Sequence, residues 1–180
     1  MKIKTFKDKK IIIRKAVKSD LRNVKKFQVF INSLIEEEAK ILMNKKATLK
    51  EEKEFLEGML KGLKNKNRVY LVAEYDDKII GATSIELDRY RRNHIGKFGI
   101  TIINGYRGIG LGKHLMSEII ELAKKELSPK PKIIQLEVYT NNKPAINLYK
   151  KMGLKIVAKI PKQIQWKNKL ISELIMMREV

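Results

Sequence analysis

The residues of this chain best suited to binding a ligand form a glycine-rich run between two apolar segments, Tyr106-Arg107-Gly108-Ile109-Gly110-Leu111-Gly112-Lys113. Glycine lets the backbone turn with positive φ and lets a ligand approach the main chain, so several N–H groups can converge on a phosphate. A helix that begins directly after the turn adds its unpaired N–H groups and the positive end of its dipole. The run therefore predicts a binding site for a pyrophosphate.

Two better-known phosphate motifs are excluded by their spacing. A P-loop needs a glycine five residues before its Gly-Lys pair and a serine or threonine after it, but Arg107 and His114 occupy those positions. A dinucleotide-binding fingerprint needs its third glycine where Lys113 stands. The remaining pattern is Arg-x-x-Gly-x-Gly, from Arg107 to Gly112. Because this pattern also occurs in ordinary loops before helices, its neighbours have to decide its meaning.

The neighbouring segments predict a strand, a helix, a second strand and a second helix. Residues 98–103 are apolar and β-branched, as in a buried strand, and residues 111–126 repeat apolar side chains at helical spacing. Residues 133–139 form a second apolar strand. Asn142 is a suitable N-cap for the helix that follows, and Pro144 is tolerated in its first turn. We expect the two strands to be parallel neighbours joined by a right-handed crossover.

The second helix carries a motif of its own, Asn142-Lys143-Pro144-Ala145-Ile146-Asn147-Leu148-Tyr149-Lys150-Lys151-Met152-Gly153-Leu154. With the glycine run, it resembles the GNAT superfamily of acetyl-CoA-dependent N-acetyltransferases, whose hallmark there is Asn-x-x-Ala-x-x-Leu-Tyr-x-x-x-Gly-Phe. Only Leu154 departs from the pattern. The resemblance, strongest from Val69 to Leu154, implies an α/β (α+β) GNAT fold. Its single mixed, mostly antiparallel twisted sheet would have about seven strands flanked by helices, with a central parallel pair that splays to hold acetyl-CoA.

The resemblance also implies how the cofactor would be bound. Main-chain groups of Ile100 and Ile102 would pair with the pantetheine arm, while their side chains belong to the core. An N–H of this strand, that of Ile102, would face the thioester oxygen. Lys113 would screen phosphate charge or remain a solvated lysine. The pyrophosphate would be held mainly through the N–H groups of Arg107, Gly108, Ile109, Gly110, Leu111 and Gly112.

Catalytic roles follow from the same resemblance. Asn142 would hydrogen-bond the pantetheine region and Tyr149 would protonate the departing sulfur. Taken alone, Asn142 is better interpreted as a helix cap and Tyr149 as a core residue, and only the full motif favours the functional roles. Attack by an amine also requires loss of its proton to a base. Glu86 is our candidate base because it lies near the end of a strand that would border the acceptor cleft. His94 and ordered water are alternatives, and Lys97 stands near where many relatives have an acidic residue.

Composition limits the other classes of protein. The 180 residues are expected to form one N-acetyltransferase domain, residues 1–180. No apolar run approaches a membrane span and the Lys-rich N-terminus lacks a signal-peptide core, so we expect a cytoplasmic enzyme. The chain has no cysteine and only two histidines, which are distant from each other. Disulfides and thiolate sites are therefore excluded, and we expect no metal site.

The net charge of +20 leaves a second class of function open. Such a charge attracts polyanions, so a non-catalytic nucleic-acid or ribosome-associated binding module is an alternative. The basic residues are spread along the whole chain rather than gathered with aromatic residues, which favours a solvated lysine-rich surface. Nucleic acid is therefore possible but not favoured, and a homodimer is also left open.

The acceptor would be an amine whose identity the sequence does not encode. Residues 27–63 and 163–168 would shape its site, and we favour a small primary amine or amino acid over a protein N-terminus or lysine. The acidic run Glu36-Glu37-Glu38 would attract a cation or simply be solvated.

The remaining elements are predicted from local signals. Thr48 and Glu51 form a capping box for one helix, and Asp76-Asp77 is expected to be a hairpin turn. At the C-terminus we expect an antiparallel pair, residues 154–160 and 169–177, separated by a loop at residues 161–167.

Overall fold

A computed structural model describes residues Met1 to Val180. No helix has the length and apolar character needed to cross a membrane. Two short 3-10 turns lie at Lys18–Arg22 and Tyr90–Arg92. The strands and helices follow in the order β1 (Lys2–Phe6), β2 (Lys9–Lys15), α1 (Val24–Glu36), α2 (Leu49–Lys64), β3 (Arg68–Tyr75), β4 (Lys78–Leu87), β5 (Ile95–Ile102), α3 (Leu111–Glu126), β6 (Ile133–Tyr139), α4 (Lys143–Lys151), β7 (Lys155–Trp166) and β8 (Lys169–Glu179).

All the strands belong to one sheet, ordered β1-β2-β3-β4-β5-β6-β8-β7. Every neighbouring pair is antiparallel except β5 and β6. The expected mixed sheet with one parallel pair is confirmed, with 8 strands rather than about seven. The additional strand is β1, in which only Phe6 is buried. β1 is the edge strand of the sheet and is mostly exposed, so its sequence lacks the alternation of apolar and polar residues from which a strand is predicted.

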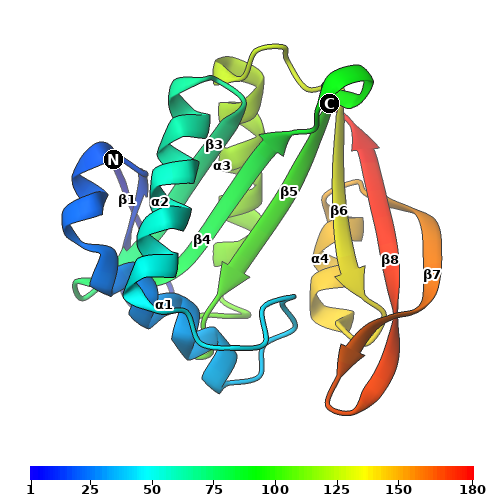
Figure 1. Ribbon diagram of the computed structural model, residues 1–180, viewed down its shortest axis with the longest axis horizontal. Helices are drawn as coiled ribbons and strands as arrows, with labels where there is room; N and C mark the ends of the chain where they lie inside the picture. Colours follow the sequence, from blue (N-terminus) through cyan, green and yellow to red (C-terminus); the bar gives the residue numbers. More distant parts are fainter.

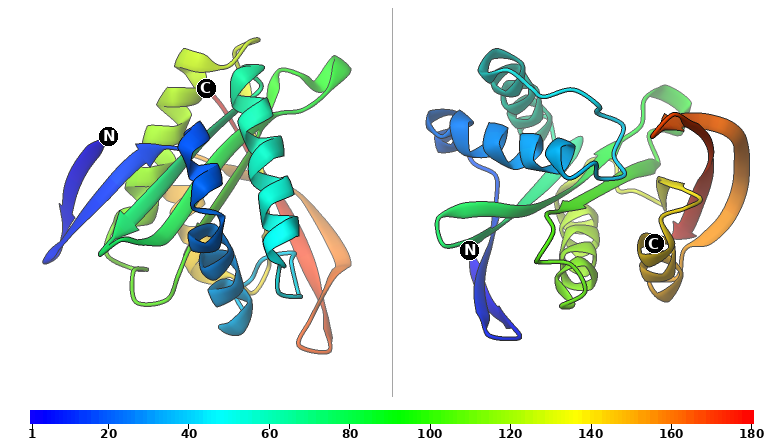
Figure 2. Two further views of the ribbon diagram at one scale, coloured as in Figure 1. Left: turned by 60° about the vertical axis from the view of Figure 1, so that its left-hand side comes forward. Right: turned by 90° about the horizontal axis from the view of Figure 1, so that it is seen from below.

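The helices cover both faces of the sheet: α1 and α2 lie on one face, and α3 and α4 on the other (Figure 1; Figure 2, right). The α3 side holds the larger core, a cluster of 25 buried residues, against 10 on the α1 side. The predicted helix at 111–126 is confirmed, because its apolar residues recur on one face and are all buried. These residues are Leu111, Leu115, Met116, Ile119, Ile120 and Ala123.

Two local predictions are also confirmed. Thr48 Oγ1 accepts from the N–H of Glu51 at 3.2 Å, and the Glu51 carboxylate accepts from the N–H of Thr48 at 2.8 Å. This capping box begins α2. Asp76 and Asp77 have φ of 50° and 57°, the paired left-handed conformation of a two-residue hairpin turn between β3 and β4.

The prediction of a loop at residues 161–167 is wrong, because β7 continues to Trp166. The register against β8 shifts between Ile160 and Ile164, so Pro161 lies at an irregularity of the ladder. In addition, β7 is the last strand of the sheet, where a residue without an N–H can be accommodated. The turn is instead Lys167-Asn168, with φ of 51° and 56°.

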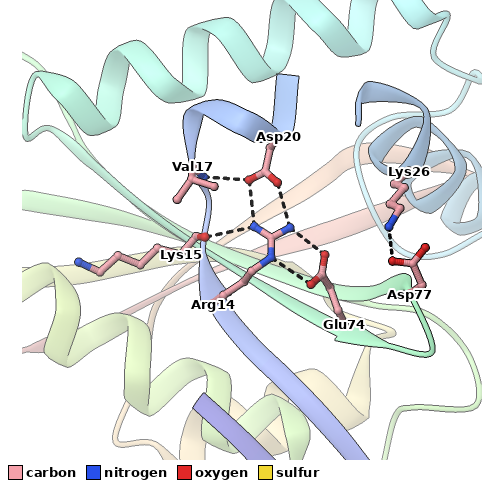
Figure 3. Close-up of polar contacts among 7 residues, drawn as sticks. All are labelled: Arg14, Lys15, Val17, Asp20, Lys26, Glu74 and Asp77. Atoms are coloured by element: carbon pink, nitrogen blue, oxygen red, sulfur yellow. Dashed lines mark hydrogen bonds and ion pairs between the residues drawn. The ribbon is translucent and has the colours of Figure 1, made fainter. Parts of the chain in front are cut away.

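A partly buried ionic cluster fixes the segment that leads into α1 (Figure 3). The guanidinium of Arg14 on β2 binds Glu74 on β3 through Nε at 3.0 Å and Nη2 at 2.7 Å, and Asp20 at 3.0 and 2.9 Å. These contacts raise the pKa of Arg14 despite its partial burial. Asp20 also accepts from the N–H of Val17 at 2.8 Å. The start of α1 is thereby tied to two strands of the sheet.

The parallel pairing of β5 with β6 is short. Its register covers only Ile95–Lys97 against Ile133–Gln135. On its other edge β5 remains paired with β4 as far as Ile102. The two strands then diverge, as the gap between them in Figure 1 illustrates. The second half of β5 therefore has one edge without a strand partner.

We predict that Gly96→Ala destabilises the fold at this parallel pairing. A Cβ on Gly96 would lie 2.7 Å from Ile85 Cγ2 and 3.1 Å from Ile134 Cδ1, both in fully buried side chains. Overpacking of this kind costs about 1–3 kcal/mol, measurable by urea unfolding. Gly58→Ala is the control, because no atom lies within 4 Å of its Cβ on α2 and the change should add roughly 0.5–1 kcal/mol. Equal stability of the two variants would contradict the prediction.

Candidate active site

The unpartnered edge of β5 presents main-chain groups rather than side chains. Ile103 donates its N–H to Ile80 O on β4 at 3.0 Å. Successive residues of a strand turn their N–H and C=O to opposite edges, so those of Ile100 and Ile102 face away from β4. The carbonyl of Ile102 accepts from Arg107 Nε at 2.6 Å. The main-chain groups of Ile100 stay available to a ligand that adds to this edge as an extra strand.

The glycine run places a row of unused N–H groups beside that edge. Tyr106 donates to Ile103 O and His114 donates to Gly110 O, but no N–H from Arg107 to Lys113 donates to a backbone carbonyl. Gly110 is the N-cap of α3 and, lacking a side chain, leaves the first turn of the helix uncapped. The free hydrogen-bond donors lie at the positive end of the helix dipole, and together they favour binding of an anion.

The glycines of the run differ in what favours glycine at each position. Gly108 and Gly110 have φ of 74° and 92°, which side chains disfavour. Gly112 is closely packed, because a Cβ there would lie 3.2 Å from Leu148 Cδ2 and 3.5 Å from Ile102 Cδ1. The start of α3 therefore lies close against α4 and β5. Ile109 is partly buried, Leu111 is fully buried and Lys113 is exposed.

The side chain of Arg107 holds the loop in place. Its guanidinium forms an ion pair with Glu37 as well as the hydrogen bond to Ile102 O. Glu37 also accepts from the N–H of Asn104 at 2.9 Å. The rest of the acidic run is paired too, Glu36 with Lys46 at 2.7 Å and Glu38 with Lys167. Each of these carboxylates therefore has a basic partner within the protein.

The two residues of the α4 motif lie on the other side of the gap. Asn142 is the N-cap of α4, but its side chain makes no capping hydrogen bond. Tyr149 is buried and packs edge-on against Phe98 of β5, with ring centroids 6.1 Å apart. Burial raises the pKa of the Tyr149 phenol to about 12, so it keeps its proton at neutral pH. Both side chains retain polar groups for a ligand.

The loop between α1 and α2 crosses to this side of the gap (Figure 1). Tyr139 at the end of β6 donates its hydroxyl to Ile41 O at 2.8 Å. Lys40 Nζ donates to Asn141 O at 3.2 Å and lies 5.5 Å from the centre of the Trp166 ring. The loop therefore connects the α1 half of the molecule to the β6 half.

A cavity of about 260 Å³ lies between α1, α2 and the sheet. Its sheet side is formed by Ala82–Ser84 of β4 and Gly99–Thr101 of β5. The cavity therefore adjoins the stretch of β5 that is paired with β4 on one edge and has no strand partner on the edge that faces β6. Most of the lining is apolar, and its large apolar side chains are Phe27, Phe30, Ile31, Met43, Phe55, Tyr70 and Ile100.

One buried carboxylate lines this cavity. Glu52 of α2 is 5% exposed, and neither a hydrogen bond nor an ion pair involves its side chain. Burial raises the pKa of Glu52 from 4.5 to about 7. Sequence reasoning missed this residue, although a signal existed. Glu52 falls on the same helical face as Leu56 and Met59, which are fully buried.

The base candidates from the sequence, Glu86 and His94, are not among the residues that line this cavity. Glu86 forms an ion pair with Arg68 across β3 and β4. Lys97 lies 3.8 Å from Glu137 on β6. His94 is partly buried just before β5, and His114 packs against Phe6 of β1. Histidine and acidic side chains form no cluster that could hold a metal ion.

Comparison with known proteins agrees with this architecture. A family model described as the acetyltransferase (GNAT) family matches residues 32–154. The chain belongs to the GNAT acetyltransferase family.

Individual relatives extend the comparison. An L-amino acid N-acetyltransferase of Escherichia coli strain K12 is 37% identical over 87 residues, which are 48% of this chain and 52% of that protein. The matched part thus spans about half of this relative. A GNAT acetyltransferase from Streptococcus pneumoniae superimposes with a TM-score of 0.81 at 27% identity, over 94% of this chain and 99% of its own.

A GNAT phosphinothricin acetyltransferase from Sinorhizobium meliloti, solved with acetyl-CoA, has the same fold. Its TM-score is 0.77 at 16% identity, over 94% of this chain and 88% of its own.

We predict that Glu52 makes folding stability depend on pH. A raised pKa means that the ionised form is disfavoured in the fold, so the cost is absent below pH 4.5 and complete above about pH 7. A shift from 4.5 to about 7 corresponds to about 3 kcal/mol at most. Glu52→Gln should therefore gain stability over the wild type between pH 5 and pH 8 in urea unfolding. Glu54→Gln, exposed on the same helix, should show no such trend, and an equal trend in both variants would contradict the prediction.

Proposed function

We propose that this protein is an acetyl-CoA-dependent N-acetyltransferase that moves an acetyl group to a primary amine by direct attack in a ternary complex. The observation that carries the proposal is the row of unused N–H groups from Arg107 to Lys113 beside the open edge of β5. Membership of the GNAT family and the acetyl-CoA complex of the Sinorhizobium meliloti protein support it. Residues 1–180 would act as one cytoplasmic catalytic domain.

The residues of the site suit acetyl-CoA. Acetyl-CoA supplies an acetyl thioester and a pyrophosphate. The N–H groups from Arg107 to Lys113 would hold the pyrophosphate, as predicted from the sequence. Ile100 and Ile102 would align the pantetheine arm, with an N–H of this strand facing the thioester oxygen. Asn142 would bind the same arm through its uncommitted amide.

Tyr149 would supply the proton for the departing sulfur. Its raised pKa keeps the phenol protonated at neutral pH, and it lies on the α4 side of the gap against Phe98. A proton given to the sulfur stabilises the charge that develops as the bond to the acetyl carbon breaks.

The acceptor would be a small primary amine or an amino acid. A cavity of about 260 Å³ is slightly smaller than the range of roughly 300–1,000 Å³ for drug-sized ligands, so it suits a compact molecule. The Escherichia coli relative is named for L-amino acids, which supports the same class. A protein N-terminus or lysine side chain is the alternative, in which only the modified residue would enter.

The proposed function is tested by thiol release from acetyl-CoA in the presence of pooled amines, amino acids and basic peptides. Turnover with one pool is expected, and the product mass should increase by one acetyl group. Absence of turnover with every pool, together with salt-sensitive retention on RNA, would favour the non-catalytic binding module instead.

We predict that Gly110→Ala weakens coenzyme A binding. Its φ of 92° strains a side chain at the first turn of α3 and would displace the N–H groups of the run. A loss of about 1.4 kcal/mol would raise the calorimetric Kd about tenfold. Gly105→Ala is the matched control, because its φ is 82° but its N–H already donates to Asn104 Oδ1 at 3.0 Å. Similar losses in both variants would argue against the run as the phosphate site.

We also predict that Tyr149→Phe lowers kcat while leaving the Kd for coenzyme A nearly unchanged. The ring would still pack against Phe98, so only the hydroxyl is removed. Loss of a general acid costs about 10²–10⁴ in rate when proton transfer limits turnover. Unchanged turnover across the pH range would exclude Tyr149 from the mechanism.

A further inference from the structure

Glu52 is a buried carboxylate without an ionic partner, and it lies in the wall of the cavity. An ionised carboxylate in an apolar environment is costly unless a partner neutralises it. Of the other two buried acids, Asp20 binds Arg14 at 2.9 Å, whereas Glu173 on β8 makes no ion pair either and does not line this cavity. Glu52 has no such partner, although the helix offers an exposed face immediately beside it. A cationic ligand in the cavity would supply the missing partner.

The cavity joins this carboxylate to the reaction centre expected on β5. Glu52 lines it from α2, and Gly99, Ile100 and Thr101 line it from β5. Gly99 contributes no side chain, so the cavity reaches the main chain of the strand. An amine that enters from the α1 side would therefore lie between Glu52 and the stretch of β5 that would align the thioester.

We propose that Glu52 accepts the proton of the amine substrate, and that the cavity selects a primary amine with an apolar side group. This inference rests on the proposed acetyltransferase function and assigns to Glu52 the role expected of Glu86 from the sequence.

The proton transfers balance as follows. An N–H bond of the ammonium breaks and the proton moves to Glu52, which leaves a lone pair on nitrogen. That lone pair attacks the thioester carbon, a C–N bond forms, and the C–S bond breaks with its electron pair on sulfur. Sulfur takes a proton from Tyr149, and the second proton lost by nitrogen restores the phenol. Glu52 then releases its proton to solvent.

The lining of the cavity determines the class of side group. Apart from Glu52, its only titratable residues are Glu51 and Tyr70. Glu51 is exposed and engaged in the capping box with Thr48, which lowers its pKa. Tyr70 is buried and neutral, because burial raises its pKa. Glu52 can neutralise one ammonium group, and no further buried group remains to neutralise a charge on the side group.

Two matched acceptor pairs test this selectivity. The pair n-pentylamine and 1,4-diaminobutane, and the pair L-norleucine and L-ornithine, each differ by a terminal methyl against an ammonium group. We expect kcat/KM to favour the apolar member at least tenfold in the pair that is turned over. Equal or reversed preference in that pair would overturn the assigned substrate class.

The role of Glu52 is tested with the better apolar acceptor. In the wild type, kcat/KM should rise with pH and level off above an apparent pKa near 7. Glu52→Gln should lose this rise and at least a hundredfold in kcat/KM, as expected for a general base. Glu52→Asp should recover part of the activity, while Glu54→Gln should match the wild type.

Calorimetry with coenzyme A distinguishes failure of the proposed role of Glu52 from failure of the proposed acetyltransferase function. Glu52→Gln should bind coenzyme A with the wild-type Kd, because Glu52 lies away from the glycine run. Wild-type kcat/KM and pH profile in Glu52→Gln would overturn the role of Glu52 and leave the acetyltransferase intact. No turnover of any acceptor by the wild type would overturn the proposed function and this inference together.

Discussion

The candidate active site exists because the hydrogen bonding between β5 and β6 ends part-way along the two strands. Three pairs of residues hold the strands together, and beyond Lys97 and Gln135 they separate. Had the pairing continued, the main-chain groups of Ile100 and Ile102 would have been used within the sheet. Because it stops, an extended ligand can complete the edge. The loops that connect the two halves, notably through Tyr139 and Ile41, then bound the opening.

The same opening separates two environments that acyl transfer needs. On the α3 side, glycines and a helix start offer main-chain donors suited to phosphates. On the α1 side, apolar residues surround one carboxylate in a small cavity. Arg107 and Glu37 connect these sides, since Glu37 ends the helix that lines the cavity and Arg107 belongs to the glycine run. The ion pair therefore couples the position of α1 to that of the loop.

Much of the fold could be predicted because its signals are local. The apolar stripe of α3, the capping box at Thr48 and the turn at Asp76-Asp77 each depend on residues a few positions apart. Strand β1 and the continuation of β7 through Pro161 could not be predicted, because both depend on position in the sheet rather than on local sequence. Likewise, the glycine run was identified from the sequence, whereas Glu52 was missed although it shares a helical face with Leu56 and Met59, because a charged residue on such a face is normally expected to reach solvent.

The N–H groups from Arg107 to Lys113 can be observed one by one. A titration of ¹⁵N-labelled protein with coenzyme A, followed by amide chemical shifts, tests the central claim most directly. If these groups hold the pyrophosphate, their resonances should show the largest downfield shifts and saturate together, with 3′-dephospho-coenzyme A producing nearly the same effect. Largest shifts elsewhere, with the glycine run unperturbed at saturation, would contradict it.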